Sequence, residues 1–148
     1  MIIVKFDRFR ETFPNRVLEW LLASILFNWG WILLLPYETF DLRTMVNFRL
    51  LAPEWAWGTA CLCIGMGRLV TLWINGSWRR SPHARGIFAI LSCLAWAHIF
   101  LALVTVGIVA PGQSTYATLF LAELYVIVRA FSEARVADEA FGVTRRSA

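Results

Sequence analysis

Four long apolar runs constrain this chain more than any other feature of its sequence. Their approximate bounds are 17–36, 55–75, 87–110 and 114–132. A helix needs about 20 predominantly apolar residues to cross a hydrocarbon core of roughly 30 Å, so each run has the length of a membrane span. Residues that commonly end helices follow the first three runs, namely Pro36, Asn75-Gly76 and Pro111. The sequence therefore predicts four membrane-spanning helices.

The overall composition agrees with a lipid environment. Of the 148 residues, 59% are hydrophobic and 16% are charged, whereas soluble domains average roughly 45–50% apolar and about 25% charged residues. A small water-soluble fold leaves much of its area exposed and could not hide this much apolar surface. We therefore expect one all-α domain over residues 1–148, an integral membrane four-helix bundle whose first partner is the lipid bilayer.

The lysines and arginines between the runs predict the orientation, because cytoplasmic loops carry an excess of both. Only Arg43 and Arg49 lie on one side of the predicted membrane. The other side has ten basic residues: Lys5, Arg8, Arg10, Arg16, Arg79, Arg80, Arg85, Arg135, Arg145 and Arg146. Both termini are therefore expected in the cytoplasm. No cleavable signal is visible, so a bacterial inner membrane is the expected location. The net charge of +4 then reflects orientation, and no nucleic-acid partner is expected.

Three segments outside the runs are also expected to be helical. Near the N-terminus, large apolar residues recur at helical spacing among charged ones, which predicts an amphipathic interfacial helix over about 2–13 that ends at Pro14. A frayed tail is the alternative there. A short interfacial helix is expected over about 39–52, and the fourth span is expected to continue as a cytoplasmic helical tail over about 133–141.

One arginine lies inside the second run. The part of the run that precedes Arg68 has only 13 residues, too few to cross a bilayer, so Arg68 must lie within the span. A charge at that depth costs at least about 2–3 kcal/mol on insertion scales unless it is paired. At about 1.5 Å per residue, each of the other runs places one strongly polar residue near the same depth. We therefore predict a buried network of Asn28, Arg68, His98 and Glu123, with Arg68 and Glu123 as an ion pair.

This polar network has three interpretations. It can serve only to fix the order and register of the helices, because each unpaired member would cost several kcal/mol in a low-dielectric interior. It can carry protons or line an ion path through Glu123 and His98, since intramembrane acids and histidines often mark such relays. Arg68 can also extend to the membrane surface. Glu19 and Arg129 lie near the inner edge and are expected to reach the lipid headgroups.

Small residues at helical spacing predict where helices pack closely. In membranes, such residues let two backbones approach each other. The two predicted packing faces consist of Gly58, Cys61 and Gly65 in the second run and Ala89, Cys93 and Ala97 in the third. The second face is a candidate contact for another copy of the chain or for a partner. The cysteines are expected to pack, because Cys61 and Cys63 point to different sides of a helix and so do not form a metal site.

The sequence has no pattern that indicates catalysis. His98 is the only histidine in a run, whereas a haem anchor would ordinarily need a second axial ligand. Nothing resembles a phosphate-binding glycine loop, a metalloprotease helix or a serine elbow. We therefore expect a protein that is not an enzyme and has no cofactor and no metal.

The layout resembles two families of small membrane proteins. Four spans with both termini inside resemble small multidrug-type transporters, which carry an embedded glutamate in their first helix. Here Glu19 lies near the membrane edge and the most deeply placed acid is Glu123, so this resemblance fails at its key residue. Short, basic-tailed, multi-span chains also resemble small membrane proteins of bacteriophage and prophage gene clusters, including holins, although holins usually have one to three spans.

Two functions of different classes follow from this sequence. In the first, the chain is a non-enzymatic bundle that self-associates as a homo-oligomer or anchors a membrane-protein partner, with a holin-like permeabiliser as one version. In the second, it is a small proton- or ion-coupled transporter or channel subunit that uses the predicted polar layer. Activity that survives the change Glu123→Gln would favour the first.

Overall fold

Helices form nearly all of the structure. The computed structural model describes residues 2–42, 45–74, 81–107 and 111–146, and within these ranges no strand is present. The elements are α1 (Ile2–Leu33), a 3-10 turn η1 (Thr39–Asp41), α2 (Val46–Arg49), α3 (Glu54–Trp73), α4 (Ser81–Thr105) and α5 (Pro111–Arg146). The prediction of an all-helical chain is confirmed.

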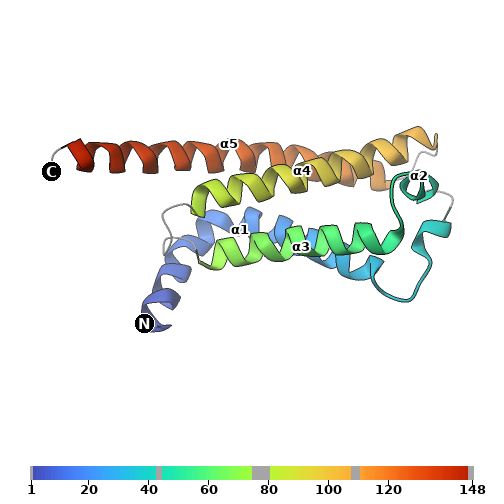
Figure 1. Ribbon diagram of the computed structural model, residues 1–148, viewed down its shortest axis with the longest axis horizontal. Coiled ribbons are helices and arrows are strands. Elements are labelled where there is room, and N and C mark those ends of the chain that lie inside the picture. The colour runs from blue at the N-terminus through green and yellow to red at the C-terminus, as the bar shows by residue number, and fades with distance from the viewer. Residues whose placement is uncertain (1, 43–44, 75–80, 108–110, 147–148) are drawn as a thin grey trace.

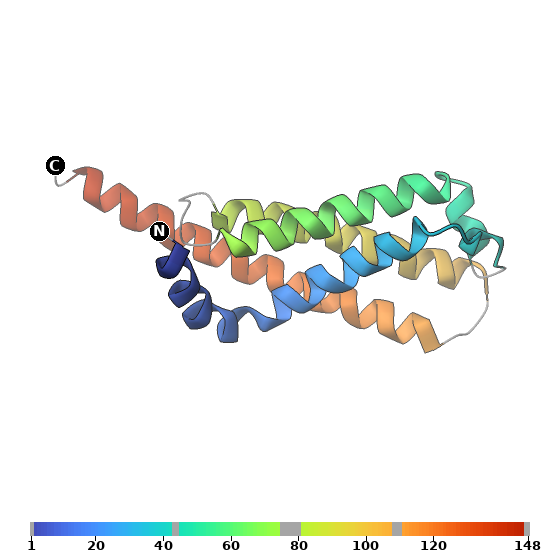
Figure 2. The ribbon, with the colours of Figure 1, turned by 90° about the horizontal axis from the view of Figure 1, so that it is seen from below.

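Four long helices run side by side in two pairs (Figure 1). Helix α1 packs mainly against α3, and α4 packs mainly against α5. Contacts between α3 and α4 join the two pairs. Helix α5 is the longest and extends beyond the other three towards the C-terminus, as both views show (Figures 1 and 2). The short elements η1 and α2 cover the opposite end of the bundle.

Glycines bring α1 and α3 into direct backbone contact. A methyl group built on Gly30 would lie 2.4 Å from the backbone nitrogen of Leu62, and one built on Gly65 would lie 2.6 Å from the backbone nitrogen of Phe27. Real side chains do not approach backbone this closely, so any larger residue at either position would force the helices apart. Gly58, Cys61 and Gly65, the predicted face of α3, are buried in this contact.

Alanines and one aromatic stack join α4 to its neighbours. Ala89 is fully buried and packs with Leu22 of α1 and Val126 of α5. Trp96 is also fully buried, and its ring stacks on that of Tyr116, with centroids 5.9 Å apart. The predicted face of Ala89, Cys93 and Ala97 is therefore largely used inside the chain, since Ala89 and Cys93 are buried and only Ala97 is partly exposed.

Two of the long helices are long and apolar enough to cross a membrane. These are α3 over Glu54–Trp73, with a mean hydropathy of 1.2, and α4 over His83–Thr105, with a mean hydropathy of 2.4. Helix α4 ends at Thr105, five residues before the predicted end of the third span, and Gly107 follows it with a φ of +71°, a conformation that suits glycine. The loop that carries Arg79 and Arg80 lies outside the described residues.

Helix α1 includes the segment predicted as a separate amphipathic helix. It runs from Ile2 without a gap and bends at Arg16, whose φ of −130° and ψ of 16° are not helical. The break therefore comes two residues after Pro14, which removes one helical hydrogen bond and crowds the preceding turn. Figure 2 shows the N-terminal part of α1 turned away from the axis of the rest.

The prediction of a single helix over 39–52 was wrong, because this segment forms the two short elements η1 and α2. Both Phe40 and Phe48 are buried, and their ring centroids lie 5.4 Å apart. A straight helix could not bring them together in this way, since residues eight apart lie about 12 Å apart along the axis. Burial of the two rings therefore folds the segment back across the end of the bundle.

Candidate functional site

Three helices bring Arg68, Ser92 and Glu123 together in the interior of the bundle. Arg68 comes from α3, Ser92 from α4 and Glu123 from α5. Arg68 is 3% exposed, and the other two are fully buried. We call these three residues the central triad. It links three of the four long helices at one depth.

The triad uses one nitrogen of the arginine and one oxygen of the carboxylate. Nη1 of Arg68 donates to Oε1 of Glu123 and also to Oγ of Ser92, at 2.8 Å. The Ser92 hydroxyl in turn donates to the same Oε1. The second oxygen, Oε2 of Glu123, is buried and has no hydrogen-bond partner among the described residues. The triad therefore keeps one acceptor atom open.

Ser92 was not among the predicted site residues. It is the only strongly polar side chain in α4 between Arg85 and His98, in a stretch that is otherwise apolar. A hydroxyl can both donate and accept, so it fits between a guanidinium and a carboxylate. Its isolation in an apolar run was the signal that could have identified it.

The structure does not include Asn28 and His98 in the same network, and the prediction of one four-residue layer was wrong in this respect. Asn28 is exposed, because the buried positions Leu22, Ala23 and Leu26 define the inner face of α1 and Asn28 points away from it. Counting residues along α1 gives Asn28 the same depth as the triad. The side of α1 that carries Asn28 faces outwards, however, so its side chain lies on the surface.

His98 belongs instead to an aromatic cluster nearer the α2 end of the bundle. Its ring stacks on Trp57 with centroids 4.9 Å apart and planes 14° apart, and it meets Phe48 edge-on. Nε2 of His98 and Nε1 of Trp57 are buried without hydrogen-bond partners among the described residues. His98 thus packs as an aromatic ring, about six residues along α4 from the triad.

A second set of buried charges lies at the other end of the bundle. Arg85 of α4 forms two hydrogen bonds with Glu19 of α1, through Nε at 2.9 Å and through Nη2 at 2.6 Å. Its Nη1 donates to Glu133 of α5 at 2.8 Å. Glu133 also accepts from Nη2 of Arg16 at 2.9 Å and from Nε of Arg129 at 3.2 Å. We call these five residues the Arg85 cluster.

The Arg85 cluster corrects the prediction that Glu19 reaches the headgroups. Glu19 is 3% exposed and Arg85 is 2% exposed, so both are buried and paired with each other. Arg129 is part of the same cluster, with a side chain 32% exposed. The sequence did not predict this pair, because Glu19 and Arg85 are 66 positions apart.

The arginines around Glu133 lower the pKa of its carboxyl group. Burial of the carboxylate disfavours its charge, but the hydrogen bond from Arg85 and the positive charges of Arg85 and Arg16 together hold the pKa of Glu133 below its ordinary value. Glu133 is therefore ionised near neutral pH. Its two oxygens connect α5 to α1 and to α4.

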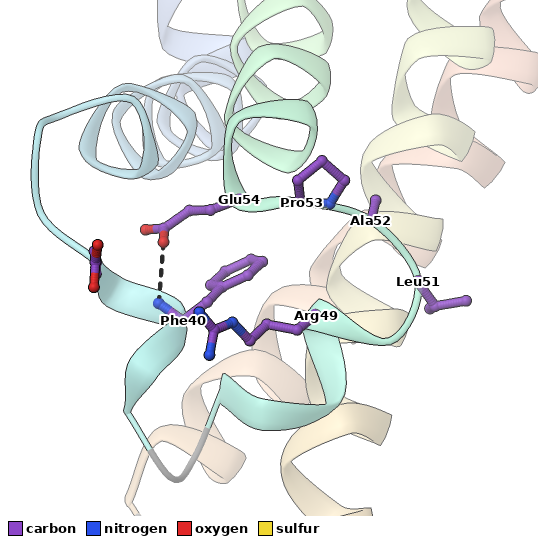
Figure 3. Close-up of a pocket in the computed structure, with 7 residues that line it drawn as sticks. Phe40, Arg49, Leu51, Ala52, Pro53 and Glu54 are labelled. Carbon is purple, nitrogen blue, oxygen red and sulfur yellow. Dashed lines mark hydrogen bonds between the residues drawn. The ribbon is translucent and has the colours of Figure 1, made fainter.

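The α2 end of the bundle has an open pocket of about 510 Å³ (Figure 3). Glu54 lies on one wall, where its carboxylate accepts from the backbone nitrogens of Thr39 and Phe40 at 3.0 and 3.1 Å. Arg49 lies on another wall and pairs with Asp41 at 2.6 Å. Glu54 thus holds η1 at the start of α3, and the Arg49–Asp41 pair links α2 to η1.

No group of three or more potential metal ligands occurs among the described residues. Comparisons with protein-family models, with curated proteins and with solved structures found no match. The features of the structure that bear on function are therefore the central triad, the Arg85 cluster and the surface of the bundle.

Proposed function

We propose that the chain is a multi-pass membrane protein in which all four long helices cross the bilayer. The observation that carries this proposal is an inverted distribution of polarity: large apolar side chains face outwards on all four helices, and the most buried charges are paired inside. The exposed apolar residues include Leu21 and Ile32 on α1, Met66 and Val70 on α3, Leu94 and Leu101 on α4, and Leu121 and Val128 on α5. In water such a surface would drive aggregation.

The arrangement of the helices supports the same proposal for α1 and α5. Helices α3 and α4 have the length and hydropathy of spans, and α1 and α5 pack along them (Figure 1). A helix that lies against a membrane span over most of its length has to share its depth. With the basic residues at the Arg85 end, both termini face the cytoplasm. A bacterial inner membrane is the proposed location.

We infer that this membrane protein acts without catalysis, by self-association or by anchoring a partner. Its buried charges are engaged in contacts between helices, as structural ion pairs are. Helix α5 extends past the other helices (Figure 1). Arg135, Val136 and Glu139 are exposed in its C-terminal part. That extension is a surface on which another protein can dock in the cytoplasm. A holin-like permeabiliser is one version, with any pore between protomers because the bundle core is filled by side chains such as Trp96.

A second function is favoured by one atom of the central triad. Oε2 of Glu123 is buried without a partner among the described residues. An intramembrane carboxylate with an open oxygen can accept a proton or bind a small cation, as in transporters and channel subunits. Under this alternative the triad is the coupling site, and His98 and Asn28 have no direct role in it.

The membrane potential of bacterial cells distinguishes the two functions. Wild type and the Glu123→Gln variant would be produced at equal membrane levels, and the potential would be followed with a voltage-sensitive dye. The anchoring proposal predicts an unchanged potential with both. A collapse with the wild type that Glu123→Gln abolishes would instead support ion conduction through the triad. A collapse that both proteins cause would support a holin-like permeabiliser in which Glu123 has only a structural role.

A further inference from the structure

The charges of the Arg85 cluster do not balance. Arg16, Arg85 and Arg129 contribute three positive charges, and Glu19 and Glu133 contribute two negative ones. One positive charge is left over among the described side chains at a site where Arg85 and Glu19 are almost completely buried. Uncompensated charge that is shielded from water is costly, so such a site favours the binding of an anion.

Arg16 is the arginine of the cluster that has a buried nitrogen without a partner among the described residues. Its Nη2 binds Glu133 at 2.9 Å, but its Nη1 is buried and has no hydrogen-bond partner among the described residues. Burial and the nearby charge of Arg85 lower the pKa of Arg16, and the attraction of Glu133 and Glu19 does not offset them. The side chain is 15% exposed, so it lies at the edge of the cluster.

The surroundings of Arg16 indicate what kind of anion fits. Arg16 lies at the bend of α1, and the next two residues, Val17 and Leu18, are exposed apolar side chains. Phe131 of α5 is also exposed on the same end of the bundle as Glu133 and Arg129. A positive group directly beside an apolar surface matches a molecule with an anionic head and a hydrocarbon tail. A phosphodiester carries one negative charge, which equals the excess in the cluster.

We propose that the Arg85 cluster binds the phosphate group of an anionic phospholipid at Arg16, with the acyl chains against Val17 and Leu18. This inference rests on the proposed membrane location of the bundle. The bound phosphate brings the charge sum of the site to zero and forms charge-assisted hydrogen bonds with the guanidinium of Arg16. It thereby stabilises the Arg16–Glu133 bond, which links α1 to α5.

Thermal unfolding in vesicles tests this proposal. The full chain would be reconstituted in phosphatidylcholine vesicles with and without phosphatidylglycerol, at constant ionic strength. Because a ligand that binds only the folded state raises its stability, the unfolding midpoint should rise by about 4 °C or more with phosphatidylglycerol. Arg16→Gln, which brings the described charge sum to zero, should lose this rise, and Arg16→Lys should keep more than half of it.

Arg135→Gln is the matched control. It also removes one positive charge from the same end of the chain, but Arg135 is 82% exposed and pairs with Glu139, outside the Arg85 cluster. This variant should keep the full rise. If it loses the rise as Arg16→Gln does, the effect belongs to the overall charge and the proposal is overturned. Where Arg16→Gln does not fold in either lipid, Arg129→Gln replaces it, because it also removes the excess charge and leaves the Arg16–Glu133 bond intact.

Two further outcomes separate this proposal from its alternatives. In uncharged detergent, millimolar inorganic phosphate should give no rise over chloride at equal ionic strength. An equal rise would assign the site to free phosphate and overturn the lipid proposal. Flotation with vesicles of both compositions after an alkaline wash, which removes peripheral proteins, shows membrane insertion independently. A protein that floats with both but unfolds at the same temperature in both would disprove the lipid site and leave the proposed function standing.

Discussion

The two buried polar sites join the four helices in different ways. The Arg85 cluster connects α1, α4 and α5 through at least five hydrogen bonds, and Arg85 alone uses three of its nitrogen atoms. The central triad connects α3, α4 and α5 through one nitrogen of Arg68 and one oxygen of Glu123, with Ser92 between them. Both sites share α4 and α5, and each adds one of the remaining helices.

This difference indicates a structural role for the Arg85 cluster and a chemical role for the central triad. In the Arg85 cluster every carboxylate oxygen accepts a hydrogen bond from an arginine. In the central triad Oε2 of Glu123 is open. We therefore assign helix order mainly to the Arg85 cluster and consider the triad the place where any ion or proton chemistry would occur.

The largest expected effect comes from Arg85→Ala. The change leaves Glu19 buried without its partner and removes two of the links between helices, which costs about 3–5 kcal/mol for a buried pair. The free energy of unfolding would be measured by titrating detergent-solubilised protein with dodecyl sulfate. Arg135→Ala serves as the exposed control, with an expected cost below about 0.5 kcal/mol. A loss of less than about 1 kcal/mol for Arg85→Ala would contradict the assigned role of the cluster.

A double-mutant cycle of Arg68 and Glu123 is expected to show a smaller cost. Arg68→Leu should destabilise by about 3 kcal/mol, because the buried Glu123 carboxylate loses its cation but keeps its hydrogen bond with Ser92. Combining it with Glu123→Leu should restore most of that loss, since apolar replacements of a buried pair are often neutral. The same unfolding titration gives both values. Additive losses in the double variant would show that the two side chains are not coupled.

The close contact of α1 with α3 gives a prediction that involves no charge. Gly65→Ala would place a methyl group 2.6 Å from the backbone of Phe27, so a loss of about 1–3 kcal/mol is expected in the same titration. Gly112→Ala is the control, because its methyl group would lie 3.4 Å from Tyr116, an ordinary contact. Equal stability of the two variants would argue against the backbone contact.

The smallest expected effect is a pH dependence at the edge of the Arg85 cluster. Arg85 and Arg16 lower the pKa of Glu133 in the folded chain. The stabilisation from Glu133 is therefore complete above its unfolded pKa, near 4.5, and is lost as the pH falls through the lower folded value. Glu133→Gln should flatten the acid limb of the stability profile by less than about 1 kcal/mol, as for a partly exposed pair. An unchanged acid limb would show that Glu133 does not titrate with folding.

The sequence identified the elements of the fold better than their ends. Hydropathy placed the long apolar segments, and α3 lies within two residues of the predicted second run. It could not predict that α1 continues through Pro14 and bends at Arg16, because that depends on how the N-terminal segment packs. The split of residues 39–52 was equally hidden, since burial of Phe40 and Phe48 decides it.

The sequence predicted the depth of the charged residues in the bundle, but not the side of the helix on which each one lies. Counting residues placed Arg68 and Glu123 at one level, and their side chains are in contact in the structure. The same count placed Asn28 there, yet its side of α1 is exposed. Glu19 was assigned to the membrane edge and Arg85 to the loop between the second and third runs. Only the tertiary packing of α1 with α4 and α5 shows that the two are buried together.

Labelling of single cysteines from the two sides of the membrane shows directly whether all four long helices cross it. The three native cysteines would be replaced, and one cysteine would be introduced at Tyr37, which is 71% exposed, or at Glu139, which is 63% exposed. With four spans, an impermeant reagent added outside intact cells should label position 37 and leave position 139 unlabelled until the cells are opened. If only α3 and α4 cross, positions 37 and 139 lie on the same side. Equal labelling of both positions in intact cells, or of neither, would contradict the account.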